Sequence, residues 1–311
     1  MKSIFRLVAK LSSRSIRFRT LALKANTLAS KLQGTKRINF YNHQLIAPSR
    51  HPLQKIHTAP FRDLALAIAS NVVFKKNRNH YVDVGANIGD TAAVIEASAN
   101  QGFNVHGTLV EPSEFFLRYL ERNAPQLNNP DIIKCFAATK YPAEDITGIF
   151  HHWTGNAEVV PVTSSIIALA DNQVNVAELI TPSTAILKVD CEGQDVEILS
   201  AMILHGLKFY PVIYFECSIQ DEFSLAKLSD LYSNLQAHYE SVIISDPDGR
   251  PIYTGEFNRS TLDVSVYQYQ SNRIKAGYLP YLDIMLFPRG SDDFLVVQQK
   301  MRSAFFTPDS F

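Results

Sequence analysis

The sequence predicts an α/β protein with a mainly parallel sheet and helices on both faces. Short apolar stretches alternate with stretches of helical periodicity from residue 63 to about residue 245, and this alternation is typical of βα units. The chain has 311 residues, of which 46% are hydrophobic and 19% charged. This length suits one large α/β domain with additions or two small ones, and the composition fits a globular protein with a sizeable core.

The first βα unit contains a glycine turn. The apolar strand 81–84 is followed by Gly85, Asn87 and Gly89, and then by a helix that Asp90 can cap. Glycine lets the backbone approach a ligand closely, and Asn tolerates the left-handed conformation better than most residues. The free N–H groups of a helix N-terminus complete a nucleotide-type site.

Acidic residues flank this turn and narrow the choice of ligand. Asp83 lies two residues before Gly85, and Asp90 directly follows Gly89. The spacing departs from the G-x-G-x-x-G pattern of dinucleotide sites, and Asp90 would repel a phosphate at the helix end. S-adenosylmethionine carries an ammonium, a sulfonium and no phosphate, so we expect it as the cofactor. The alternative is an ordinary glycine turn with a capping Asp.

An acid also ends the second predicted strand. The strand 105–110 leads into Glu111, which lies 22 residues after Gly89. This is the position at which a carboxylate grips the ribose diol of a bound nucleotide. The alternative is a surface Glu in a βα loop. A helix over 113–123 and a third strand over 132–138 are expected next.

A second charged stretch follows a buried strand that begins at residue 186. Lys188, Asp190 and Glu192 alternate with apolar residues, so at period two they share one face at the carboxyl end of the strand. Asp190 and Glu192 are candidate general bases, and Lys188 could fix their orientation or charge. The alternative is a structural ion network. A helix is expected after Gly193.

The remaining stretches predict further helices, strands and turns. Residues 139–170 predict a hairpin or insertion, and the pair His151 and His152 lacks the partners of a metal site, so no metal is expected. Residues 250–280 have no assignment. The other expected elements are a helix over 63–73, a strand over 211–217 with Glu216 at its tip, a helix over 221–238, a strand over 241–245, a turn over 246–249 and a last hairpin strand over 281–287.

The N-terminal region differs from the rest in charge. Residues 1–62 carry 13 Lys and Arg and no Asp or Glu, which leaves 17 basic against 30 acidic residues in the remainder. Residues 1–37 predict a basic amphipathic helix, which fits a peripheral membrane contact, a transit peptide or a solvated extension. Residues 38–62 predict a linker, and residues 63–311 the main domain. Because that domain is acidic, nucleic acid is not an expected substrate.

Several motifs in a fixed order resemble the FkbM family of S-adenosylmethionine-dependent methyltransferases. The resemblance covers about residues 81–217, and it departs where the family often has Thr-Leu-Asp and this chain has Val162 to Ile166. The motifs are Asp83-Val-Gly85-Ala-Asn87-Ile-Gly89-Asp90, Val110-Glu111-Pro112 with Asn123, Leu187-Lys188-Val-Asp190-Cys-Glu192-Gly193 with Glu197, and Phe215-Glu216.

This resemblance implies a class I methyltransferase fold, with a mainly parallel seven-stranded sheet and one antiparallel edge pair. It also implies O-methylation of a sugar, glycan, glycolipid or natural-product hydroxyl. Two other classes stay open, namely a Rossmann-type nucleotide-sugar enzyme and a non-catalytic methyltransferase-like scaffold. The three cysteines fit neither a zinc nor a disulfide pattern, so a cytoplasmic protein is expected, with peripheral contact at the inner membrane surface as one option.

The basic N-terminal segment predicts salt-sensitive binding to anionic vesicles, because each basic residue near the surface contributes about 1 kcal/mol. Vesicle flotation at low salt tests this. If the full-length protein stays out of the anionic vesicle layer, residues 1–37 are not a membrane contact.

Overall fold

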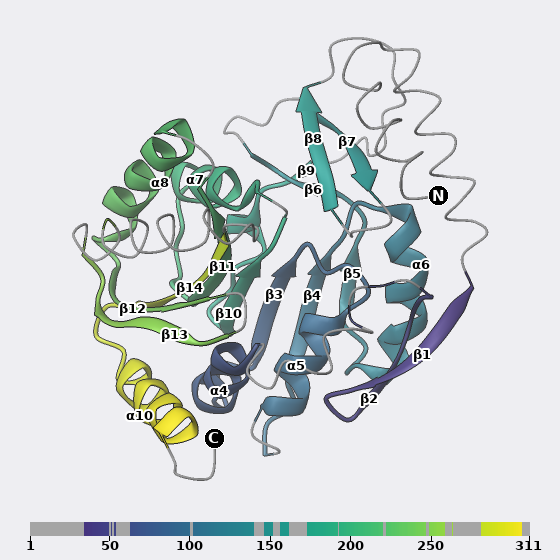
Figure 1. The fold of residues 1–311 in the computed structure, drawn as a ribbon, viewed down its shortest axis with the longest axis horizontal. Coiled ribbons are helices and arrows are strands. Elements are labelled where there is room, and N and C mark those ends of the chain that lie inside the picture. Colours follow the sequence, from purple (N-terminus) through teal and green to yellow (C-terminus); the bar gives the residue numbers. More distant parts are fainter. Residues whose placement is uncertain are drawn as a thin grey trace.

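A sheet of eight strands runs through the molecule and carries helices on both faces (Figure 1). The computed structural model describes residues 34–49, 51, 53, 63–99, 102–139, 146–151, 156–161, 173–191, 193–219, 222–246, 249–258, 263 and 281–306. Within this part of the chain, no helix is both long and apolar enough to cross a membrane.

The strand order reverses in the middle of the sheet, between β3 and β10. From one edge to the other the strands are β5 (Asp131–Ile133), β4 (His106–Val110), β3 (His80–Val84), β10 (Thr184–Val189), β11 (Val212–Ser218), β14 (Tyr281–Pro288), β12 (Tyr239–Ser245) and β13 (Pro251–Glu256). The first five are parallel neighbours, whereas β14 is antiparallel to both β11 and β12. This order confirms the predicted class I methyltransferase fold.

Two features of the sheet differ from the sequence expectation. The last strand, β14, is not part of an edge pair, because it lies inside the sheet between β11 and β12. The sheet also has an eighth strand, β13, which comes from the stretch that had no assignment and pairs antiparallel with β12. Both differences arise from pairings between segments distant in sequence, which local periodicity does not report.

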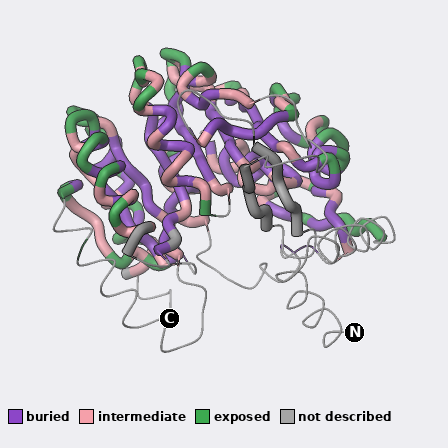
Figure 2. The backbone as a smooth tube through the Cα atoms, turned by 90° about the horizontal axis from the view of Figure 1, so that it is seen from above, coloured by how far each residue is buried: buried purple, intermediate pink, exposed green. Residues whose placement is uncertain are grey.

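The two faces of the sheet are covered by different helices. Tyr81 and Tyr214 face the first core, and the adjacent Val82 and Phe215 face the second, as the alternation along a strand requires. Figure 2 shows the buried strands enclosed by helices whose outer surfaces are exposed. The first face carries α4 (Leu64–Val73), α5 (Asp90–Ser98), α6 (Glu114–Asn123) and α10 (Asp293–Phe306), and the second carries α7 (Asp195–His205) and α8 (Glu222–Leu235).

The N-terminal region contains a β-hairpin in place of part of the expected linker. It consists of β1 (Thr35–Phe40) and β2 (His43–Pro48), which pair antiparallel. The expected helix over 1–37 is wrong for residues 35–37, because these residues belong to β1. Residues 1–33 lie outside the described part of the chain, so the rest of that prediction and the boundary at residue 62 stay predictions.

A small upper region rises beyond the carboxyl ends of the strands (Figure 1). The expected third strand splits, so that β5 joins the main sheet and β6 (Phe136–Ala137) pairs with β9 (Gln173–Val174). The expected hairpin is confirmed as β7 (Ile146–His151) and β8 (Asn156–Pro161). Two short 3-10 helices, η1 (Ala124–Gln126) and η2 (Val176–Glu178), complete the described elements.

Candidate functional site

The candidate site lies at the carboxyl ends of β3, β4 and β10, where the strand order reverses. In open α/β sheets, ligands bind outside the strand ends at such a switch point. The chain leaves β3 for the neighbouring β4 on one side, whereas β10 lies on the other side. Every strand-end residue that the sequence singled out in β3, β4 and β10 therefore belongs to one region of the molecule, apart from Glu192, which is outside the described residues.

The glycine turn after β3 is present as predicted. Gly85, Asn87 and Gly89 all have positive φ, at 83°, 52° and 87°, and Gly85 donates its N–H to the carbonyl of Val110 at 2.9 Å. Asp90 is the first residue of α5 and not its cap, because Gly89 takes the N-cap position. Its carboxylate in the first helical turn still suits the helix dipole.

Gly85 is held against the strand on the other side of the switch point. A Cβ added at Gly85 would lie 2.0 Å from the carbonyl oxygen of Asp190. The N–H of Asp190 in turn donates to the carbonyl of Val84 at 3.0 Å. The turn and the end of β10 are therefore in backbone contact, and only glycine fits at this position.

Glu111 ties the glycine turn to the tip of β4. Its side chain accepts the N–H of Asn87 on Oε2 at 2.9 Å and the N–H of Ser113 on Oε1 at 2.7 Å. The residue is only 5% exposed. Burial raises the pKa of Glu111 to about 7, although the two backbone hydrogen bonds act in the opposite direction. Each carboxylate oxygen keeps a further lone pair for a ligand hydroxyl.

Lys188 sits between two carboxylates. Its Nζ lies 3.0 Å from Asp83 Oδ1 and 3.5 Å from Asp190 Oδ2, and it donates to the carbonyl of Gly85 at 3.4 Å. Burial alone would lower the pKa of Lys188, but the charges of Asp83 and Asp190 raise it. Asp83 on β3, Lys188 on β10 and Asp190 directly after β10 therefore form one charged cluster.

Asp83 differs from the expectation of a carboxylate open to the ligand. It is 0% exposed, and its carboxylate forms an ion pair with Lys188. Burial raises the pKa of Asp83 while Lys188 lowers it, and the net shift is upward. Asp190, with a side chain 41% exposed, is the carboxylate of the cluster that solvent reaches.

The loop after β10 is fixed by Asp195, the first residue of α7. Asp195 is 1% exposed and accepts the N–H groups of Cys191 at 3.3 Å and Gly193 at 3.2 Å. Burial and the nearby Asp190 raise the pKa of Asp195 well above its usual value. Asp195 therefore shapes the loop that carries Asp190.

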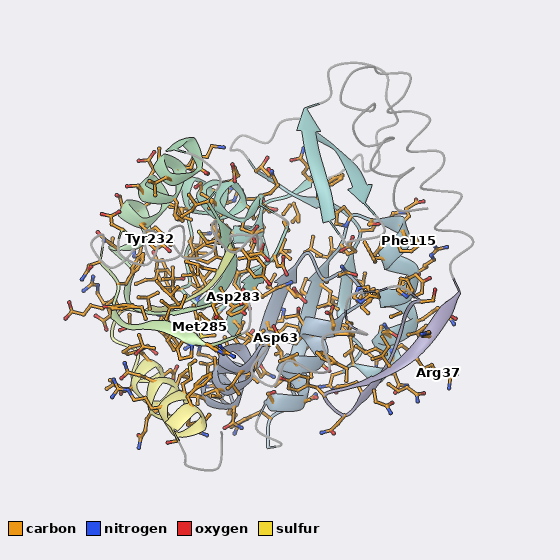
Figure 3. All side chains as sticks on the ribbon, viewed as in Figure 1. Arg37, Asp63, Phe115, Tyr232, Asp283 and Met285 are labelled. Atoms are coloured by element: carbon orange, nitrogen blue, oxygen red, sulfur yellow. The ribbon has the colours of Figure 1, made fainter. Side chains whose placement is uncertain are left out.

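A second polar group lies farther along the same edge, on β11 and β14. Glu216 is opposite Asp283 in the antiparallel register, and Asp283 is labelled in Figure 3. Tyr214, which is beside Lys188 in the sheet, is buried, and its pKa is raised well above the usual value by burial and by Asp283. Tyr214 and Asp283 had no signal in the sequence, because their proximity depends on the insertion of β14.

The chain matches no family model, and a comparison with curated proteins finds no match. Similar solved structures include methyltransferase FkbM from Methylobacillus flagellatus, at 13% identity and TM-score 0.41 over 70% of this chain and 48% of that chain. Fibrillarin from Aeropyrum pernix, solved with bound S-adenosyl-L-methionine, is 12% identical with TM-score 0.40, over 82% of this chain and 98% of that one.

Precorrin-6y C5,15-methyltransferase from Geobacter metallireducens is 11% identical, with TM-score 0.37 over 72% of this chain and 86% of that chain. The strand order of the central sheet establishes the fold of this chain.

Gly85→Ala should destabilise the protein far more than Gly193→Ala. Both residues have positive φ, but a Cβ at Gly85 meets the Asp190 carbonyl, whereas a Cβ at Gly193 meets nothing within 4 Å. Gly193→Ala should cost about 1–2 kcal/mol from backbone strain alone, and Gly85→Ala more than about 3 kcal/mol from strain plus overpacking. Urea unfolding measures both, and equal losses would contradict the backbone contact.

Glu111→Gln should change how stability depends on pH. The folded protein keeps the Glu111 proton up to a pKa of about 7, against 4.5 for the ordinary group. This contribution is complete below pH 4.5 and is lost as the pH rises through 7, by roughly 3 kcal/mol in total. Unfolding free energies of both proteins from pH 4 to 8 measure the difference. Parallel curves would show that Glu111 titrates normally.

Proposed function

We propose that the protein is an S-adenosylmethionine-dependent methyltransferase that methylates a hydroxyl oxygen. The proposed acceptor is a sugar, a glycan or glycolipid, or a natural product. The observation that carries the proposal is the glycine turn at the switch point, which is joined to the buried Glu111 on one side and to Asp190 on the other. We also propose that the chain belongs to the FkbM family, because its sequence motifs occur in the order found in that family.

The donor set around the turn suits a nucleoside with cationic groups better than a pyrophosphate. The turn has the positive-φ backbone of a close-approach loop. The groups that line it are acids: Asp90 in the first turn of α5 and Glu111 at the tip of β4. Carboxylates at these positions would repel phosphate but accept hydrogen bonds from ribose hydroxyls and attract an ammonium.

In this proposal each residue of the turn has a defined role. Gly85, Asn87 and Gly89 shape the backbone that receives the cofactor, and Glu111 accepts the ribose hydroxyls. Asp83 has an indirect role, because it is buried and acts through Lys188. Asp90 contributes negative charge at the entrance to the turn.

When bound, S-adenosylmethionine supplies an electrophilic methyl group, which passes to the acceptor oxygen as its bond to sulfur breaks. Asp190 is proposed to take the proton that the acceptor hydroxyl loses as the oxygen–carbon bond forms. The partial exposure of the Asp190 side chain gives it access to a substrate. Its Oδ2 also lies 3.5 Å from Nζ of Lys188, which helps to fix the orientation of the carboxylate. Glu192, the alternative base, lies outside the described residues.

The proposed partners are a small-molecule or glycan acceptor and, through residues 1–37, an anionic membrane surface. The acidic balance of residues 63–311 is the reason for excluding nucleic acid. If the acceptor is attached to a membrane, binding of residues 1–37 to that membrane would bring the enzyme to its substrate. A nucleotide-sugar enzyme and a non-catalytic scaffold are the competing functions, and the next two experiments separate them.

Calorimetric titration of the purified protein should show one site for S-adenosylmethionine and none for NAD. Glu111→Ala should weaken the binding of S-adenosylmethionine by about 1–3 kcal/mol, as for the loss of a hydrogen bond to a charged group. Gly85→Val should abolish binding. A wild-type protein that binds NAD and not S-adenosylmethionine would refute the proposed cofactor.

Asp190→Asn should lower turnover on the order of 100-fold or more while cofactor affinity stays near normal, because the variant keeps its shape and loses the base. Asp230→Asn, on the exposed side of α8, is the matched control and should turn over normally. Activity is measured per folded molecule. Unchanged turnover together with a large drop in melting temperature would identify the Asp190 cluster as structural.

A further inference from the structure

We propose that His51 is a positioning residue of the cofactor site, acting through the side chain of Asn87. The inference rests on the proposed function, since it concerns how the glycine turn receives its ligand. His51 lies in the basic N-terminal region, well before the strand that opens the main sheet, and no sequence motif included it. It is 8% exposed.

The contacts of His51 define its tautomer. The N–H of Leu53 donates to Nδ1 at 3.3 Å, so Nδ1 is the acceptor of a neutral imidazole and Nε2 carries the proton. Nε2 lies 3.3 Å from Oδ1 of Asn87, to which it can donate. The ring also packs edge-to-face on Phe116 of α6, with 6.4 Å between ring centroids, so its position is held by packing as well.

The orientation of the Asn87 amide follows from this contact. Because Nε2 of His51 is a donor, the acceptor Oδ1 of Asn87 faces it. The two hydrogens on Nδ2 of Asn87 therefore point away from His51. Within the described part of the chain, Nδ2 has no hydrogen-bond partner. Asn87 is half-buried in the middle of the turn, so these hydrogens are available to an acceptor atom of the bound nucleoside.

The backbone of Asn87 is hydrogen-bonded to Glu111. Its own N–H donates to Glu111 Oε2, and its φ of 52° is in the left-handed region. A hydrogen-bonded series therefore runs from His51 through Asn87 to Glu111, the proposed ribose acceptor. Loss of the His51 contact would free the Asn87 side chain and loosen the turn at its centre.

The hairpin that precedes His51 is fixed to the same turn at a second point. Asn123 is fully buried and binds both backbone groups of Ile46 on β2, at 2.7 and 3.0 Å. Its Nδ2 also donates to the carbonyl of Ile88 inside the turn at 2.8 Å. Figure 1 shows β1 and β2 beside α6. The N-terminal hairpin therefore forms part of the wall behind the site.

The test is a set of calorimetric affinities for S-adenosylmethionine with the full-length protein. His51→Leu removes both ring nitrogens and should weaken binding about 10-fold. His51→Gln can accept from Leu53 and donate to Asn87, so it should bind within about threefold of wild type. His43→Leu is the matched control, because His43 lies on the hairpin that precedes His51 but contacts the Gln126 carbonyl instead of the turn. It should bind normally.

Asn87→Gly keeps the left-handed backbone and removes the amide, so it should lose at least as much affinity as His51→Leu. The double variant should bind no more weakly than Asn87→Gly alone, because His51 acts through the Asn87 side chain. This variant also tests the proposal if His51→Leu fails to fold. Wild-type affinity in Asn87→Gly, or an equal loss in His43→Leu, would overturn the role of His51. Absence of binding by the wild-type protein would instead refute the proposed function.

Discussion

The ion pair between Lys188 and Asp83 joins the two central strands where the strand order reverses. Both side chains are buried, and two charges removed from water are costly unless they pair. Apolar residues of similar size would often stabilise such a position equally well or better. The pair therefore has its main value in what it positions, namely the Gly85 carbonyl and the Asp190 carboxylate that Lys188 also contacts.

The rest of the site is arranged around this pair by backbone contacts. The turn after β3 rests on the carbonyl of Asp190, the tip of β4 is joined to the turn through Glu111, and Asp195 shapes the loop after β10. Three strand ends are thus held in one geometry before any ligand arrives. Such preorganisation reduces what a ligand must order when it binds.

Local sequence patterns predicted the parts of the fold that depend on neighbouring residues. The glycine turn, Glu111 at the tip of β4 and the buried strand before Asp190 follow from residue type and period two. The burial of Asp83 did not follow, because a strand end in the sequence does not show which helix covers it. His51 and Tyr214 were also missed, since their roles come from contacts with segments far away in the chain. β13 begins with Pro251 and contains Gly255, a composition that suits an edge strand and gives a weak strand signal.

The position of β14 has a consequence for the order in which the molecule is built. During synthesis, β11 and β12 are complete before residues 281–288 exist, and these residues supply the strand that bonds to both of them. Until then, each strand has an open edge that can pair with another chain. The sheet closes only when a late segment inserts between two earlier ones, so shortening the chain from its C-terminal end would divide the sheet in two. The nascent protein is therefore most exposed to misassembly just before its last strand emerges.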